Sequence, residues 1–150
     1  TMIPPKIDRY NQTKKRLTAQ ITALLGGRAS EEMKLSEFSI GASSDIKNAT
    51  SIAREMVTKY GMSSLGPMSF DSRLGEGESW PYRSPLGDEI EYSDEVLSTI
   101  DKEVKGIVDA CYQKAKKLVE DNTDILDKVA EELMEKETLS GDEFRELINE

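Results

Sequence analysis

The chain has 150 residues, of which 37% are hydrophobic, 33% charged and 6% aromatic, a balance that predicts one domain of amphipathic helices and excludes disorder throughout. Twenty basic residues stand against 29 acidic ones, and the formal charge of −9 would repel the phosphate backbone of a nucleic acid. Histidine is absent, which excludes any catalytic arrangement within these residues that needs an imidazole.

A short strand followed by a helix is predicted at the start of the chain. Adjacent Pro4 and Pro5 exclude a helix there, and the Thr-Met-Ile before them is typical of the end of a strand. From Thr13, apolar residues recur at helical spacing until Gly26 and Gly27, which are expected to interrupt the helix before a short helical continuation.

A second helix is predicted after a loop. Ser43 and Ser44 offer hydroxyl groups that suit the cap of its first turn, and Gly61 is expected to close it. Apolar residues repeat every three or four positions in between: Ile46, Ala49, Ile52, Ala53, Met56, Val57 and Tyr60. Residues 62–92 hold most of the remaining prolines and glycines and are predicted to form a long, irregular and mobile segment.

Three further helices are predicted after this segment. Ser93 is the expected cap of the first, which should end near Asn122. A second amphipathic helix follows, and Ser140 to Glu143 has the pattern of a capping box before a last short helix. The single cysteine, Cys111, belongs to the apolar pattern of the first of these helices, so we interpret it as a small core residue in a reducing compartment.

The predicted fold is therefore mainly α: a single domain over residues 1–150, built as a bundle of five to six helices with a short remnant strand at the N-terminus. No stretch of the sequence approaches the roughly 18 consecutive apolar residues of a membrane span. The chain by itself is accordingly expected to be soluble. Composition and periodicity predict this architecture but no function.

Asp45 is the sharpest candidate for a functional residue. On a helical wheel it lies within about 40° of Ala49, Ile52 and Met56, so its carboxylate points along the apolar face. A carboxylate on a buried face needs a partner: a metal ion, an arginine, or the backbone N–H groups at the start of its own helix. The residues alone favour the last of these, an acidic residue stabilised by capping and by the helix dipole.

A second candidate cluster follows the paired glycines: Glu31 and Glu32 come shortly after Gly26, Gly27 and Arg28. Glycines inside a helix cost about 1 kcal/mol each relative to alanine, and such sites often mark the close approach of another backbone. A neighbouring carboxylate could then support the ligands of a metal. The simpler interpretation is a helix break followed by a charged, solvated turn.

Four motifs stand out together: Gly26-Gly27-Arg28-Ala29-Ser30-Glu31-Glu32, Gly41-Ala42-Ser43-Ser44-Asp45-Ile46, Ala53-Arg54-Glu55-Met56-Val57-Thr58 and Gly61-Met62-Ser63-Ser64-Leu65-Gly66-Pro67. In sequence, order and spacing they resemble the peptidase domain of the FtsH family, which are membrane-anchored ATP-dependent zinc metalloproteases. The resemblance extends over about residues 3–148.

The resemblance implies a zinc site made by two histidines of an H-E-x-x-H helix and a later aspartate, and it places that aspartate at Asp45. Glu31 or Glu32 would support the site, and neither spacing nor resemblance says which of the two faces the metal. The resemblance further implies a hexameric ring, a separate ATP-binding module, membrane anchoring with the peptidase on the cytoplasmic side, and unfolded or membrane proteins as substrates.

The chain departs from the family in one respect: the H-E-x-x-H segment is expected upstream of Thr1, and no histidine is present. Because a hydrolytic zinc ion usually needs three protein ligands, the chain alone is expected to be inactive, with no catalytic residue of its own. It is either the helical part of a larger zinc protease, which its abrupt start favours, or a natural relative without the catalytic helix that serves as a non-catalytic assembly or interaction module.

Overall fold

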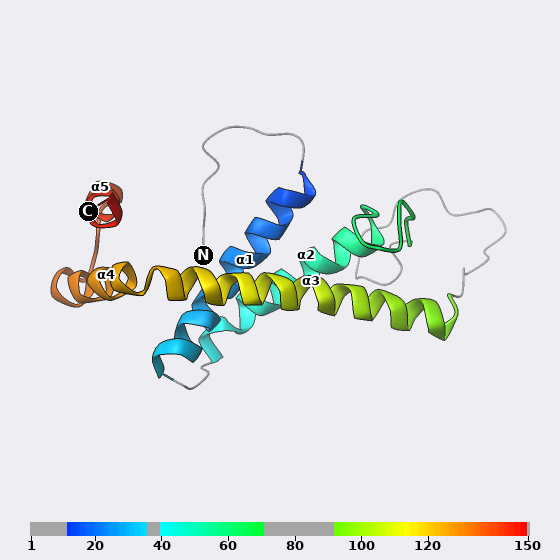
Figure 1. Ribbon diagram of the computed structural model, residues 1–150, viewed down its shortest axis with the longest axis horizontal. Coiled ribbons are helices and arrows are strands. Elements are labelled where there is room, and N and C mark those ends of the chain that lie inside the picture. Colours follow the sequence, from blue (N-terminus) through cyan, green and yellow to red (C-terminus); the bar gives the residue numbers. More distant parts are fainter. Residues whose placement is uncertain (1–11, 36–39, 71–91, 150) are drawn as a thin grey trace.

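The computed structural model describes residues 12–35, 40–70 and 92–149 (Figure 1). Its elements are α1 (Lys14–Leu35), the short 3-10 helix η1 (Ile40–Ala42), α2 (Ser43–Thr58), α3 (Asp94–Asp121), α4 (Thr123–Lys136) and α5 (Gly141–Asn149). The prediction of a mainly helical fold with five or six helices is confirmed. No strand occurs in the three described ranges, and the strand expected at the N-terminus lies outside them.

Three of the helices share one hydrophobic core. α1 and α2 form an antiparallel hairpin, and the long α3 crosses both of them (Figure 1). The largest fully buried side chains come from all three: Ile21 from α1, Met56 and Val57 from α2, and Ile100 and Cys111 from α3. The apolar repeats in the sequence therefore identify the faces that pack together, and Cys111 is a core residue as predicted.

α1 continues through Gly26 and Gly27 without interruption, so the predicted helix break is wrong. The cause is tertiary packing: Ile21, Leu25 and Ala29, spaced four apart on either side of the glycines, are all buried, and their burial outweighs the roughly 1 kcal/mol that each glycine costs. A Cβ atom added at either glycine would meet no heavy atom within 4 Å. Among the described residues, no backbone approaches this pair closely.

The start of α2 also differs from the prediction. Its N-cap residue is Ala42, whose side chain accepts no hydrogen bond, and Ser43 and Ser44 are the first two residues of the helix itself. The reason is η1, because this turn leads the chain straight into the helix ahead of the serines. At the other end α2 finishes at Thr58 with Lys59 as its C-cap residue, two residues before the predicted Gly61, which adopts the left-handed conformation with a φ of 58°.

The segment after α2 folds back against the core in its described part, residues 62–70. The N–H of Phe70 donates to the carbonyl oxygen of Thr58 at 2.7 Å, and the buried Phe70 ring lies edge-on to Tyr92 with 5.8 Å between centroids. The contact therefore brings together the two ends of 71–91. Those residues lie outside the described part of the chain, as does the predicted mobility of the segment.

The caps predicted for the later helices are confirmed. The Ser93 hydroxyl accepts from the N–H of Val96 at 3.4 Å at the start of α3. Before α5, the Glu143 carboxylate accepts from the Ser140 N–H at 2.8 Å and the Ser140 hydroxyl accepts from the Glu143 N–H at 3.3 Å, a reciprocal capping box. α3 ends at Asp121, and Asn122 separates it from α4, as predicted.

α4 and α5 stand apart from the three-helix core. Although α4 is amphipathic, it contributes no buried residue, and it packs mainly on α5. Figure 1 shows the two helices projecting beyond the end of α3. We call residues 123–149 the arm.

The open environment of Gly27 predicts that Gly27→Ala stabilises the 150-residue chain by about 1 kcal/mol, because alanine removes the entropy cost of a helical glycine and meets no steric conflict. Urea denaturation followed by circular dichroism measures the change. A loss of stability would contradict this and indicate that some segment packs closely on the glycine pair.

Gly61→Ala is the matched control. Gly61 has a positive φ, and an added Cβ would lie 2.9 Å from the Cα atom of Pro67. The same chemical change should therefore destabilise the chain there, by about 1 kcal/mol or more.

Candidate functional site

Asp45 is half-buried in the first turn of α2. Four, seven and eleven residues later along the same face come Ala49, Ile52 and Met56, of which the first and last are fully buried and Ile52 packs against the core. The apolar face predicted for this helix is thus confirmed, and Asp45 lies at its beginning. A carboxylate in the first turn is also stabilised by the helix dipole, so the location suits a helix-stabilising carboxylate as well as a metal ligand.

The two candidate glutamates lie at the same end of the hairpin as Asp45. The end of α1 lies in space beside the beginning of η1 and α2, because α1 and η1 are in contact and η1 leads directly into α2. The last turns of α1, with Glu31 and Glu32, therefore sit beside the first turn of α2. Figure 1 shows the end of α1 beside the start of α2, and the three sequence-predicted acidic residues belong to these turns.

Glu32 is held against α3 by both oxygens of its carboxylate. The Tyr112 hydroxyl donates to one oxygen, and the Lys116 ammonium donates to the other at 2.9 Å. The same ammonium lies 5.6 Å from the centre of the Tyr112 ring, so the three side chains form one compact group. Glu31 is half-buried as well, but successive helical side chains point about 100° apart, so it does not share the direction of Glu32.

These contacts change the acidity of both partners. The hydrogen bond from Tyr112, together with Lys116, lowers the pKa of Glu32 below its ordinary value. Burial, followed by the neighbouring Glu32 carboxylate, raises the pKa of the Tyr112 hydroxyl. At neutral pH Glu32 is therefore a carboxylate, and Tyr112 is a neutral phenol that donates to it.

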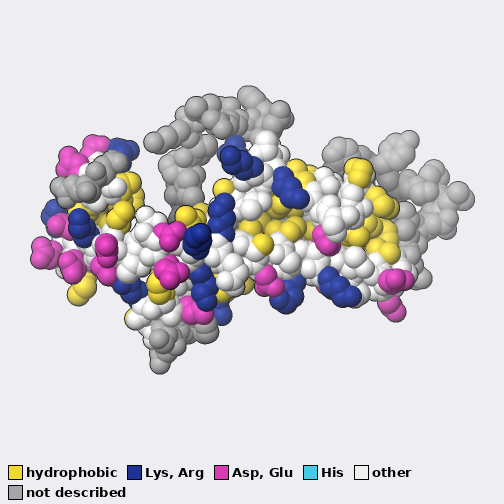
Figure 2. Space-filling model, viewed as in Figure 1, with side chains coloured by type: hydrophobic (Ala, Val, Ile, Leu, Met, Phe, Trp, Pro, Cys, Tyr) yellow, Lys and Arg dark blue, Asp and Glu magenta, His cyan; other side chains and the backbone are white. Residues whose placement is uncertain are grey.

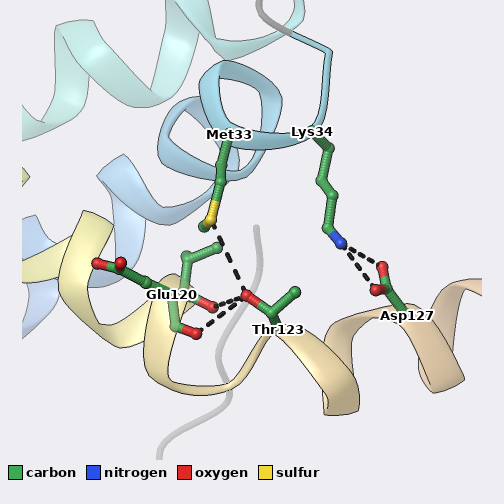
Figure 3. A network of polar contacts seen from close by, with 6 residues as sticks. Met33, Lys34, Glu120, Thr123 and Asp127 are labelled. Carbon is green, nitrogen blue, oxygen red and sulfur yellow. Dashed lines mark hydrogen bonds and ion pairs between the residues drawn. The ribbon is translucent and has the colours of Figure 1, made fainter.

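A second set of contacts joins the end of α1 to the arm (Figure 3). The Lys34 ammonium lies 2.6 and 2.7 Å from the two carboxylate oxygens of Asp127. The Thr123 hydroxyl oxygen lies 3.9 Å from the Met33 sulfur and 3.0 Å from the carbonyl oxygen of Glu120. The last turn of α1 is thus tied to the junction of α3 and α4, 93 residues further along the chain.

Glu103 is a positioning residue that the sequence analysis did not identify. Its carboxylate accepts from the Ser64 N–H at 3.0 Å and from the Ser64 hydroxyl at 2.7 Å, which lowers the pKa of Glu103. The pair holds the segment after α2, one of the family-like motifs, on α3. The only signal in the sequence was that Glu103 is an acidic residue on the predicted helix, which does not distinguish it from its neighbours.

The described residues do not build a zinc site by themselves. Zinc is bound by cysteine, histidine and carboxylate side chains, usually four ligands at a structural site and three at a catalytic one. The sequence has no histidine and its one cysteine lies in the core. No group of three such side chains occurs within 12–35, 40–70 and 92–149. Asp45 would thus provide one carboxylate ligand out of the required set.

None of the helices in the described ranges is both long enough and apolar enough to cross a lipid bilayer.

Comparison with known proteins identifies relatives of the whole chain. Residues 1–147 match the family model for peptidase family M41. The ATP-dependent zinc metalloprotease FtsH of Caldicellulosiruptor bescii is 47% identical over 151 residues, which cover 100% of this chain and 24% of the relative. The FtsH proteins of Thermotoga maritima and Bacillus subtilis are 43% and 42% identical, and the matches cover 100% and 97% of this chain but 24% and 23% of those relatives. The chain spans about a quarter of the length of these curated relatives.

The Glu32 group predicts a specific pH dependence. Because the pKa of Glu32 is lower in the folded chain than the ordinary 4.5, its charged form stabilises the fold above that value, and this contribution is lost as the pH falls through the folded-state pKa. Glu32→Gln should therefore lower Tm at neutral pH and lose less stability than the unmodified chain when acidified.

Thermal unfolding from pH 7 to pH 3 measures this difference. Glu131→Gln removes an exposed carboxylate from α4 and is the matched control, which should follow the unmodified chain closely. Identical pH profiles for the Glu32 variant and the unmodified chain would show that the Tyr112 and Lys116 contacts do not stabilise the charged form.

Proposed function

The chain belongs to peptidase family M41, and from this premise we propose that it forms the mainly helical part of the peptidase module of an ATP-dependent zinc metalloendopeptidase. The observation that carries the proposal is the match of residues 1–147 to the family, together with relatives that bear this activity in their names. The ATP-binding module would lie in the parts of those relatives that this chain does not span.

In this proposal Asp45 is a zinc ligand. Its carboxylate is half-buried, lies at the beginning of the buried face of α2, and stands on a helix that the core holds rigidly through Met56 and Val57. An aspartate oxygen is an ordinary ligand for zinc. The other ligands would come from the two histidines of an H-E-x-x-H helix beyond these 150 residues, so the chain alone would be inactive.

Glu31 and Glu32 would support that site from α1. Glu32 would do so by fixing the end of α1 on α3 through Tyr112 and Lys116, because that end of the hairpin carries the start of α2.

The proposal extends to the protein as a whole on the same family resemblance. It would assemble as a hexameric ring anchored in a membrane, with the peptidase modules on the cytoplasmic side. Its substrates would be unfolded or membrane proteins.

A non-catalytic assembly or interaction module of the same family is the alternative. The observation that favours it is the donor set, because the described residues offer no complete zinc site. The gene sequence immediately upstream of the Thr1 codon separates the two: an in-frame H-E-x-x-H supports the protease, and a start codon or unrelated sequence there excludes it.

Asp45→Ala in the full-length protein should reduce zinc-dependent proteolysis by a factor of about 100 or more, since loss of groups that merely orient a ligand already costs 10- to 100-fold. ATP hydrolysis should be retained, because the ATPase module does not contain this residue. Casein degradation, ATP turnover and bound zinc are measured on the same preparation.

Asp109→Ala, which removes an exposed aspartate from α3, should leave all three values unchanged. Normal proteolysis by the Asp45 variant would exclude its role as a ligand. In the 150-residue chain the same substitution should cost no more than the ~1 kcal/mol of a first-turn carboxylate, and a larger loss would indicate a structural role instead.

A further inference from the structure

The arm is attached to the rest of the chain by few contacts. In the described part of the chain, no hydrophobic side chain of residues 123–149 belongs to the core cluster or packs against it, and α4 contributes no buried residue. The backbone connection from α3 is the single residue Asn122, whose φ of −123° and ψ of 27° depart from helical values. The angle between the arm and the three-helix core is therefore set by the contacts of its first turns.

Two contacts with the last turn of α1 set this angle (Figure 3). The Lys34 ammonium lies 2.6 and 2.7 Å from the two carboxylate oxygens of Asp127, and the Thr123 hydroxyl oxygen lies 3.9 Å from the Met33 sulfur. We call these two contacts the clasp. A basic anchor suits the arm, because residues 123–149 carry nine acidic and three basic side chains. Figure 2 shows the acidic ones in magenta over the arm.

The clasp is weak enough to open. The Lys34 and Asp127 side chains are 35% and 52% exposed, and an ion pair at such exposure shifts an equilibrium by a factor of roughly 1.5 to 5. The Met33 contact adds little, because a thioether sulfur is a weak hydrogen-bond acceptor. The docked and released positions of the arm thus differ little in free energy, so a bound partner or a change in ionic strength is enough to shift their populations.

The last turn of α1 is anchored on two sides. Glu32 is bound to α3 through both oxygens of its carboxylate, whereas Lys34, two residues later, is bound to the arm. α1 ends one residue after Lys34, and η1 is in contact with α1 and leads directly into α2, whose third residue is Asp45. A movement of the arm therefore acts on the end of α1 that lies beside the Asp45 turn, while Glu32 stays fixed on α3.

We propose that the clasp couples the angle of the arm to the turn that carries Asp45, and that the arm thereby regulates the candidate metal site. With the arm docked, the end of α1 is held on both sides, and η1 and the first turn of α2 keep the arrangement described above. With the arm released, the end of α1 loses one anchor and the Asp45 carboxylate is held less firmly. Lys34 and Asp127 are thus positioning residues. The effect on zinc rests on the proposed function, and the coupling between the arm and the turn does not.

The coupling is tested in the 150-residue chain without zinc, using Asp127→Lys to replace the attraction with repulsion. Spin labels on Ala23→Cys in α1 and Met134→Cys in α4, both exposed positions, report the position of the arm by double electron-electron resonance. Cys111 is buried and stays unlabelled. In the Asp127 variant the distances between the labels should spread over a wider range, and the backbone amide NMR signals of residues 41–45 should shift.

Two further variants separate the clasp from a general effect of charge. Glu135→Lys makes the same charge change at an exposed position two turns further along α4 and should alter neither measurement. Lys34→Glu combined with Asp127→Lys restores the pair with its charges exchanged and should reverse at least half of both changes. Raising the salt from about 0.02 to 0.5 M should widen the label distances in the chain with an intact clasp, because screening weakens the pair. Circular dichroism verifies that every variant is folded.

Zinc affinity in the full-length protein tests the effect on the site. Asp127→Lys should weaken zinc binding at least threefold in competition with a chromophoric chelator, and the charge-exchanged double variant should recover most of the loss. Glu135→Lys should bind zinc as the unmodified protein does. An unchanged zinc affinity in the Asp127 variant would overturn the regulation of the site.

Three results in the 150-residue chain would overturn the coupling itself: an arm that keeps its position in the Asp127 variant, a displaced arm that leaves the signals of residues 41–45 unchanged, or no recovery on charge exchange. Each of these leaves the proposed function standing, because that proposal is decided by the Asp45→Ala variant of the full-length protein. Conversely, normal proteolysis by the Asp45 variant, with the coupling present in the 150-residue chain, would retain the coupling and remove its connection to zinc.

Discussion

The burial of one face of α1 between α2 and α3 is the constraint on which the rest of the structure depends. Ile21, Met56 and Ile100 belong to one core cluster and are all buried, and the packing of α1, α2 and α3 on one another holds α3 across the hairpin. It also keeps α1 helical through two glycines. Because the hairpin is rigid, the carboxylates at its end occupy fixed positions, which is the condition for any role of Asp45 in a binding site.

The local sequence pattern predicted the features that depend on interactions between residues close together in the chain. The spacing of apolar residues located the buried face of α2 and the place of Asp45 on it, and hydroxyl and carboxylate residues in the right register located the caps at Ser93 and Ser140. The glycine pair was misjudged because helix propensity, about 1 kcal/mol per residue, is smaller than the gain from burying Leu25 and Ala29 beside it.

Contacts between residues far apart in the sequence could not be predicted from its pattern. Glu32 finds its partner Tyr112 eighty residues away, and nothing near either residue in the sequence indicates the other. The arm is a second case: the alternation in α4 correctly predicts an amphipathic helix, but periodicity says only that an apolar face exists. Whether that face is covered depends on which elements pack against it. In this chain α1 and α2 pack on α3, and α4 packs mainly on α5. The proposal that Asp45 is a metal ligand rests on family membership and not on its surroundings, because the described residues offer no complete set of zinc ligands.

The edge-on contact between Phe70 and Tyr92 has a consequence for the tolerance of the fold to insertions. Because the two rings are only 5.8 Å apart, the connection from Phe70 to Tyr92 begins and ends at neighbouring places. The packing of these two residues on the core, and not the length of the connection, holds its ends together. The entropy of closing such a connection grows only logarithmically, by about 0.6 kcal/mol for each doubling of its length. Relatives can therefore diverge in length here, or accept a fused peptide, at little cost to the three-helix core.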